Sequence, residues 1–143
     1  MAHPYHTRAS VVAELPPQFL LEALDDDGDG IEDDGLYEAV AAAASEAVDA
    51  YLAARVPVPL GSPSALASQA SRVFALESLY ARRGYSKDSD PPNPWYPRAQ
   101  ELRRRLERIA SGEEPYEVDR SGPSVDTITE PSRTTSRAGR MGA

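Results

Sequence analysis

Apolar residues recur at three- and four-residue spacing in two long segments of this chain, which predicts two long amphipathic helices. The first segment covers residues 36–55 and the second covers residues 63–83. Pro57 follows the first segment, and proline cannot continue a helix. Ser62 is the expected N-cap of the second helix, and Gly84 is the residue expected to end it.

Shorter apolar patterns predict three further helices. The first is expected from Ser10 to Leu15, because Ser10 can cap it, and the residues from Phe19 to Leu24 give a second apolar face. The last helix is expected from about residue 95 to residue 110, with a narrow apolar stripe of Ala99, Leu102, Leu106 and Ile109. The predicted fold is therefore all-α, a small helical bundle.

One face of the helix expected over residues 36–55 consists of small and medium-sized apolar side chains. Small side chains let a neighbouring helix approach closely, so this face is the predicted packing face of the bundle and could also pack between protomers. Its residues are Leu36, Val40, Ala44, Ala47 and Tyr51. The helix expected over residues 63–83 has a broader apolar face, which predicts burial on two sides in the middle of the bundle.

The composition changes after residue 112, where Ser, Thr, Pro, Gly and Arg dominate. Such a segment cannot bury enough apolar surface to fold alone. Its few anchoring side chains are Tyr116, Val118, Val125 and Ile128. The sequence therefore predicts two parts: a helical domain over residues 1–112 and a long extended C-terminal arm over residues 113–143 that docks on other chains.

Residues 25–34 alternate carboxylates with glycines, as a loop that wraps a hard cation would. Aligned as a calcium loop, the expected ligands are the side chains or carbonyls of Asp25, Asp27, Asp29, Ile31 and Asp33. Leu36 stands where an EF-hand has its bidentate glutamate, so this is no EF-hand and any calcium site is weak. The alternative is an acidic turn whose aspartates cap the helix that begins near Gly35.

The net charge of −8 argues against general affinity for nucleic acid, because phosphate binding needs clustered Lys and Arg. The one basic cluster, Arg103–Arg105 with Arg108, is expected to be a solvated helix face or a protein contact. Glu101 with Arg105, and Arg103 with Glu107, are its expected ion pairs.

No residue constellation indicates an enzyme. The chain has no cysteine and two histidines, His3 and His6, which are expected in an N-terminal tail without further metal ligands. No apolar run approaches the ~20 residues that a membrane span requires. No certain cofactor follows from the sequence, and calcium is the one candidate ion.

The order of these features resembles the small head–tail connector (adaptor) proteins of Mu-like prophages. The resemblance covers residues 5–112. It begins in the acidic loop, with Leu24-Asp25-Asp26-Asp27-Gly28-Asp29-Gly30-Ile31-Glu32-Asp33. It continues through the helix end Asp49-Ala50-Tyr51-Leu52 and through Pro57-Val58-Pro59-Leu60. The last helix matches with Tyr96, Ala99 and the ending Ile109-Ala110-Ser111-Gly112, while Val56 stands where the family often has an aromatic residue.

The resemblance implies a structural virion protein in the neck, between the head and the tail. It implies a dodecameric ring of sister subunits beneath the portal protein, which extends the DNA channel and receives a stopper or tail-completion protein. DNA would pass through without specific binding, and assembly would take place in the host cytoplasm. The runner-up interpretation of the residues is a soluble calcium-binding interaction module.

Overall fold

A computed structural model describes residues 4–116, and this part of the chain forms five α-helices and no strand. They are α1 (Arg8–Val12), α2 (Phe19–Leu24), α3 (Leu36–Leu52), α4 (Ala65–Arg82) and α5 (Tyr96–Ser111). The predicted all-α helical bundle is confirmed. Of the expected arm, only residues 113–116 are described. Val118, Val125 and Ile128 lie outside the described residues.

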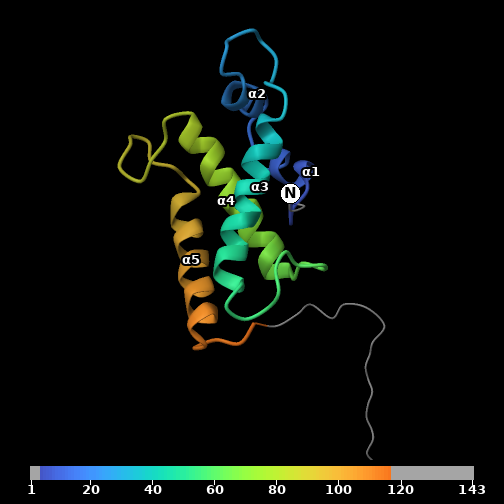
Figure 1. Ribbon diagram of the computed structural model, residues 1–143. Helices are drawn as coiled ribbons and strands as arrows, with labels where there is room; N and C mark the ends of the chain where they lie inside the picture. The colour runs from blue at the N-terminus through green and yellow to red at the C-terminus, as the bar shows by residue number, and fades with distance from the viewer. Residues whose placement is uncertain (1–3, 117–143) are drawn as a thin grey trace, which may run out of the picture.

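The three long helices α3, α4 and α5 pack side by side, the short helix α2 lies at one end of this bundle, and the short helix α1 lies against its side (Figure 1). Helix α4 contacts all four other helices, which confirms the burial predicted from its broad apolar face. Its fully buried side chains include Val73, Leu76 and Leu79. Burial of each such side chain contributes about 1.5–3 kcal/mol, so α4 organises the core.

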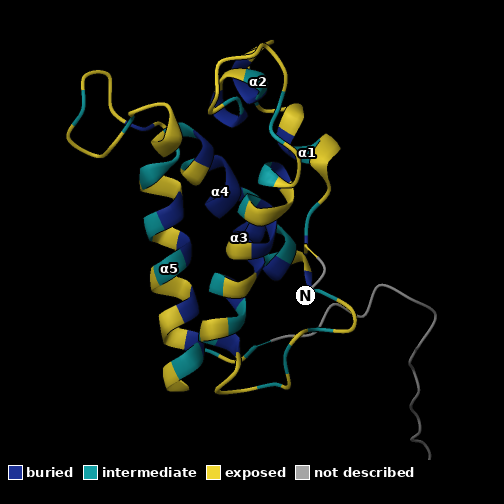
Figure 2. Cartoon of the chain, turned by 45° about the horizontal axis from the view of Figure 1, so that its top comes forward, coloured by how far each residue is buried: buried dark blue, intermediate teal, exposed yellow. Residues whose placement is uncertain are grey.

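Buried residues line the facing sides of the helices, and exposed residues cover their outer sides (Figure 2). The most deeply buried line of α3 consists of Ala41, Ser45, Val48 and Leu52, all with no exposed surface. Within the predicted packing face, Ala44 is buried, whereas Leu36, Val40, Ala47 and Tyr51 are half-buried and pack at the edge of the core. The centre of the buried face thus lies one position away from the predicted stripe.

Two helix starts differ from their predictions. Helix α1 begins earlier than expected, because Thr7 and not Ser10 is its N-cap: the Thr7 Oγ1 accepts from the Ser10 backbone N at 3.1 Å. Helix α4 begins after Ser64 and not after Ser62, because the Ser64 Oγ accepts from the Ala67 N at 3.1 Å.

The predicted end of α4 at Gly84 is confirmed. Gly84 has a φ of 92°, which glycine adopts without the steric cost that a Cβ imposes. The Gly84 N donates to the Ala81 carbonyl at 3.0 Å, and the Tyr85 N donates to the Tyr80 carbonyl at 3.1 Å. This pair of bonds is a Schellman motif, and the rings of Tyr80 and Tyr85 pack edge to face across it at 5.4 Å.

The segment before α1 lies against the bundle, so His6 is not in a tail as expected, whereas His3 lies outside the described residues. Tyr5 is buried, and its backbone N donates to the Ser45 Oγ of α3 at 3.0 Å. The His6 Nδ1 lies 2.6 Å from the Ser71 Oγ of α4, which in turn lies 2.9 Å from the Ser45 Oγ. These buried polar groups satisfy one another, which removes the cost of burying them unpaired.

Among the described residues, no helix is both long enough and apolar enough to cross a lipid bilayer.

Candidate functional site

The acidic loop, residues 25–34, connects α2 to α3 and projects from the end of the bundle (Figure 1). Its two ends are joined by a hydrogen bond from the Asp33 N to the Leu24 carbonyl at 2.9 Å. Arg82 of α4 holds the loop from below, since it donates both to the Ala23 carbonyl and to the Asp26 carboxylate. The loop is therefore closed at its base and fixed to the bundle.

Inside the loop, aspartate side chains accept hydrogen bonds from the backbone. Asp25 accepts from the N–H groups of Gly28, Asp29 and Gly30 at 2.8–3.1 Å. Gly28 and Gly30 have φ of 75° and 86°, a left-handed conformation that L side chains rarely adopt. The alternation of aspartate and glycine therefore fixes a tight turn by local contacts alone.

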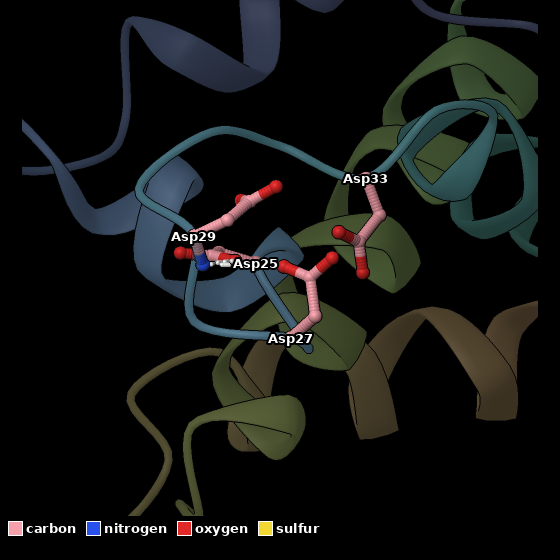
Figure 3. Close-up of side chains that lie close together, drawn as sticks. All are labelled: Asp25, Asp27, Asp29 and Asp33. Carbon is pink, nitrogen blue, oxygen red and sulfur yellow. Dashed lines mark hydrogen bonds between the residues drawn. The ribbon is translucent and has the colours of Figure 1, made fainter.

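The structure brings together four of the five residues expected to bind calcium. Asp25, Asp27, Asp29 and Asp33 each present a carboxylate oxygen, and these oxygens all lie within 4.8 Å of one another (Figure 3). The fifth, Ile31, has an exposed side chain, and its backbone N donates to the Asp29 Oδ1 at 3.0 Å.

Hydrogen bonds and neighbouring charges inside the loop shift the pKa values of Asp25 and Asp27. The N–H of Gly30, together with further hydrogen bonds, lowers the pKa of Asp25. The N–H of Asp29 lowers the pKa of Asp27. The hydrogen bond between the Asp27 and Asp25 side chains and the nearby charge of Asp29 raise the pKa of Asp27, which lies above its ordinary value as a result. The cluster thus concentrates negative charge in a small volume.

Oxygen ligands at such separations suit a hard divalent cation of the calcium type. A bidentate glutamate is missing, which places this geometry among weak sites. The alternative role of the aspartates as caps of the next helix is not what the structure shows: α3 has Gly35 at its N-cap position and no side-chain capping bond.

The arginine face of α5 differs from its predicted pairing. Glu101 pairs with Arg98 at 3.1 Å, Arg103 pairs with Glu77 of α4, and Arg105 pairs with Glu114 at 2.7 Å. The two expected pairs, Glu101 with Arg105 and Arg103 with Glu107, do not form. The helix therefore uses its arginines to contact α4 and the residues that follow α5.

The residues that follow α5 remain attached to the bundle. The Tyr116 hydroxyl donates to the Ser64 Oγ at 2.9 Å. Glu114 forms ion pairs with both Arg105 and Arg108, and the hydrogen bond from Arg105 lowers the pKa of Glu114. The first four residues of the expected arm therefore belong structurally to the helical body.

A protein-family model described as Bacteriophage Mu, Gp36 matches residues 5–132 of the chain. The chain belongs to this Mu Gp36 family. It is thus a Mu-like phage protein, and the Gp36 family indicates a role in phage structure or assembly. A search of curated proteins finds no match.

The Gp36-family match begins at Tyr5 and continues past the described body. The sequence alone did not indicate the structural role of Tyr5, because Tyr5, Ser45 and Ser71 come together only in the folded bundle. The one available signal was the serine on each of the two most buried helix faces, where a polar side chain needs a partner.

Proposed function

We propose that this chain joins the portal of the phage head to the tail, as a structural protein of the virion neck. Sister subunits form a ring, a dodecamer by analogy with connector proteins, that extends the DNA channel of the portal. The observation that carries the proposal is the Mu Gp36 family match over residues 5–132, which includes the whole described bundle.

The form of the described body supports a geometric role. It is a compact all-α bundle, in which the side chains of Tyr5 and His6 take part in packing and structural hydrogen bonds. Burial, together with a hydrogen bond to Asp49, raises the pKa of Tyr5 to about 12. Both groups have structural partners, and the proposal includes no catalytic step.

The charge of the chain supports a channel through which DNA slides. A net charge of −8 repels the phosphate backbone, so DNA would pass without specific binding. The partners in this proposal are the portal protein, a stopper or tail-completion protein, and sister subunits. The residues of the arm beyond Tyr116 are assigned to contact with one of these partners, and assembly is assigned to the host cytoplasm.

The test is binding to the portal protein of the same phage. Purified chain and portal are mixed and separated by size exclusion with light scattering, which gives the mass of each complex. A ring-sized complex that contains both proteins is the expected result. A chain that elutes alone at every ratio contradicts the proposal.

A second chain that ends after Tyr116 tests the arm with the described body intact. It is expected to keep its helical circular dichroism spectrum and to bind portal more weakly. Equal portal binding by the two chains would remove the arm from the proposal.

A further inference from the structure

A shallow open groove of about 350 Å³ runs between α4 and α5. Its floor includes Leu102 and Gln69, and its walls carry four arginines and one glutamate. These residues are Arg98, Glu101, Arg104, Arg105 and Arg108. The groove is therefore a basic surface on a chain whose net charge is −8.

The charges of the groove are only partly compensated within the described part of the chain. Arg105 and Arg108 share one carboxylate, that of Glu114, and about half of each arginine side chain is exposed. Arg98 pairs with Glu101 across one turn of the helix. Arg104 is exposed and forms no ion pair with the described residues. The groove thus offers net positive charge to a partner.

The same molecule carries a surface of opposite charge. The acidic loop, residues 25–34, has seven carboxylates and no basic residue. Arg82 pairs with Asp26 and Arg8 pairs with Glu32. Five aspartates remain without an arginine partner among the described residues, and Ile31 stands exposed beside them. The loop therefore carries the charge that is complementary to the arginines of the groove.

In one chain the loop lies at the end of the bundle, whereas most of the groove lies along its side. Arg82 fixes the loop at one end of α4, whereas Gln69 lines the groove 13 residues earlier on the same helix. At 1.5 Å per residue this is about 20 Å along the helix. Figure 1 shows the loop beyond the end of the bundle and α5 along its side. Any contact between these surfaces is therefore a contact between two chains.

We propose that the arginine groove of α5 binds the acidic loop of a second copy of this chain. The contact is heterologous, because one surface of each copy meets a different surface of the next. Such a contact propagates from copy to copy and forms a ring where the rotation closes. This inference rests on the proposed function, since it assigns the sister-subunit contact that the ring requires.

DNA is the competing occupant of an arginine groove. The net charge of −8 and the projecting acidic loop oppose the approach of a phosphate backbone. A second copy carries the same net charge, but it presents carboxylates on one projecting loop, which places complementary charges together while the rest of the two acidic surfaces stays apart.

The test uses two charge reversals in the full-length chain, Arg104→Glu in the groove and Asp34→Arg in the loop. The side chains of Arg104 and Asp34 form no ion pair or hydrogen bond in the described structure, so both variants should fold. Lys87→Glu and Asp88→Arg change the net charge by the same amounts in an exposed loop outside both surfaces. Sedimentation velocity in EDTA at low salt measures self-association of each chain alone and of chains bound to portal.

Each reversal is expected to weaken self-association about tenfold, while its matched control leaves it unchanged. An equimolar mixture of the Arg104→Glu and Asp34→Arg chains is expected to associate again, because the intact loop of one meets the intact groove of the other. Higher salt should weaken the wild-type association.

The proposal is overturned if the wild-type copies never associate, alone or on portal, or if the matched controls weaken association equally. It is also overturned if wild type binds a DNA duplex and Arg104→Glu loses that binding. Portal binding distinguishes failure of this inference from failure of the proposed function. If wild type binds portal and Arg104→Glu leaves self-association unchanged, only the groove contact is disproved. If wild type does not bind portal at all, the proposed function is disproved.

Discussion

At the scale of single residues, the stability of the described body depends on a chain of buried polar groups. The His6 ring faces Ser71 of α4 and the Tyr37 hydroxyl of α3, while Arg72 stands nearby on α4. Burial, and then the charge of Arg72, lowers the pKa of His6 from 6.5 to about 4. The folded chain therefore keeps this imidazole neutral under conditions in which a free histidine carries a proton.

A depressed histidine pKa makes stability depend on pH. Between pH 6.5 and about 4 the unfolded chain binds a proton at His6 and the folded chain does not, so acid favours unfolding. Stability is expected to fall by about 1–2 kcal/mol across this window and then to level off, less than the full linkage value because solvent screens a partly buried ring. Urea unfolding at about pH 7 and about pH 4.5 measures it.

The control for this pH effect is His6→Gln, which keeps a polar side chain and cannot titrate. The other acidic and basic groups contribute equally to both chains, so the difference between their slopes belongs to His6. Parallel pH curves for wild type and His6→Gln would show that the ring does not carry the effect.

At the scale of the helices, most of the long elements follow from local sequence, but their starts do not. The apolar periodicity placed α3, α4 and α5 within a few residues. The N-cap of α4 was missed because Ser62 and Ser64 stand on either side of Pro63, and both serines meet the requirements of a cap. The structure selects Ser64, whose Oγ is buried and is also contacted by Tyr116. This second contact depends on residues that sequence periodicity does not connect.

Ser64 and Ser62 give a matched pair of substitutions. Ser64→Ala removes the acceptor for the Ala67 N and leaves the Tyr116 hydroxyl without its partner, so it is expected to cost about 1–2 kcal/mol. Ser62→Ala changes an exposed residue outside the helix and is expected to stay within about 0.5 kcal/mol of wild type. Chemical denaturation of both variants checks the pair. Equal losses of stability in the two variants would contradict the assignment of Ser64 as the N-cap.

At the scale of the whole molecule, the acidic loop was predictable from the sequence, but the contacts that attach the N-terminal segment and residues 113–116 to the bundle were not. The hydrogen bonds that the aspartate side chains accept inside the loop join residues two to seven positions apart, so a sequence pattern already contains this part of its geometry. The hydrogen-bond network of Tyr5, His6, Ser45 and Ser71 joins residues up to 65 positions apart, and no local sequence pattern indicates it. The same holds for the contacts of residues 113–116, which the sequence analysis assigned to the arm.

The end of the folded body is testable by comparing a chain that ends after Tyr116 with one that ends after Gly112. The shorter chain loses the ion pairs of Glu114 with Arg105 and Arg108, and the hydrogen bond of Tyr116 to Ser64. Loss of that buried hydrogen bond, with the partial burial of the Tyr116 ring, is expected to cost about 1–2 kcal/mol. Thermal and urea unfolding of the two chains measure this difference.

Tyr116→Phe in the chain that ends after Tyr116 separates the two parts of the effect, because it keeps the ring and removes the hydroxyl. A loss of about 1 kcal/mol in this variant assigns that share to the bond with Ser64. Identical unfolding curves for the chains that end at Gly112 and Tyr116 would place the end of the body at Gly112, as composition alone predicts. Greater stability of the longer chain places it at Tyr116, since the segment that follows α5 is then attached to the N-cap residue of α4.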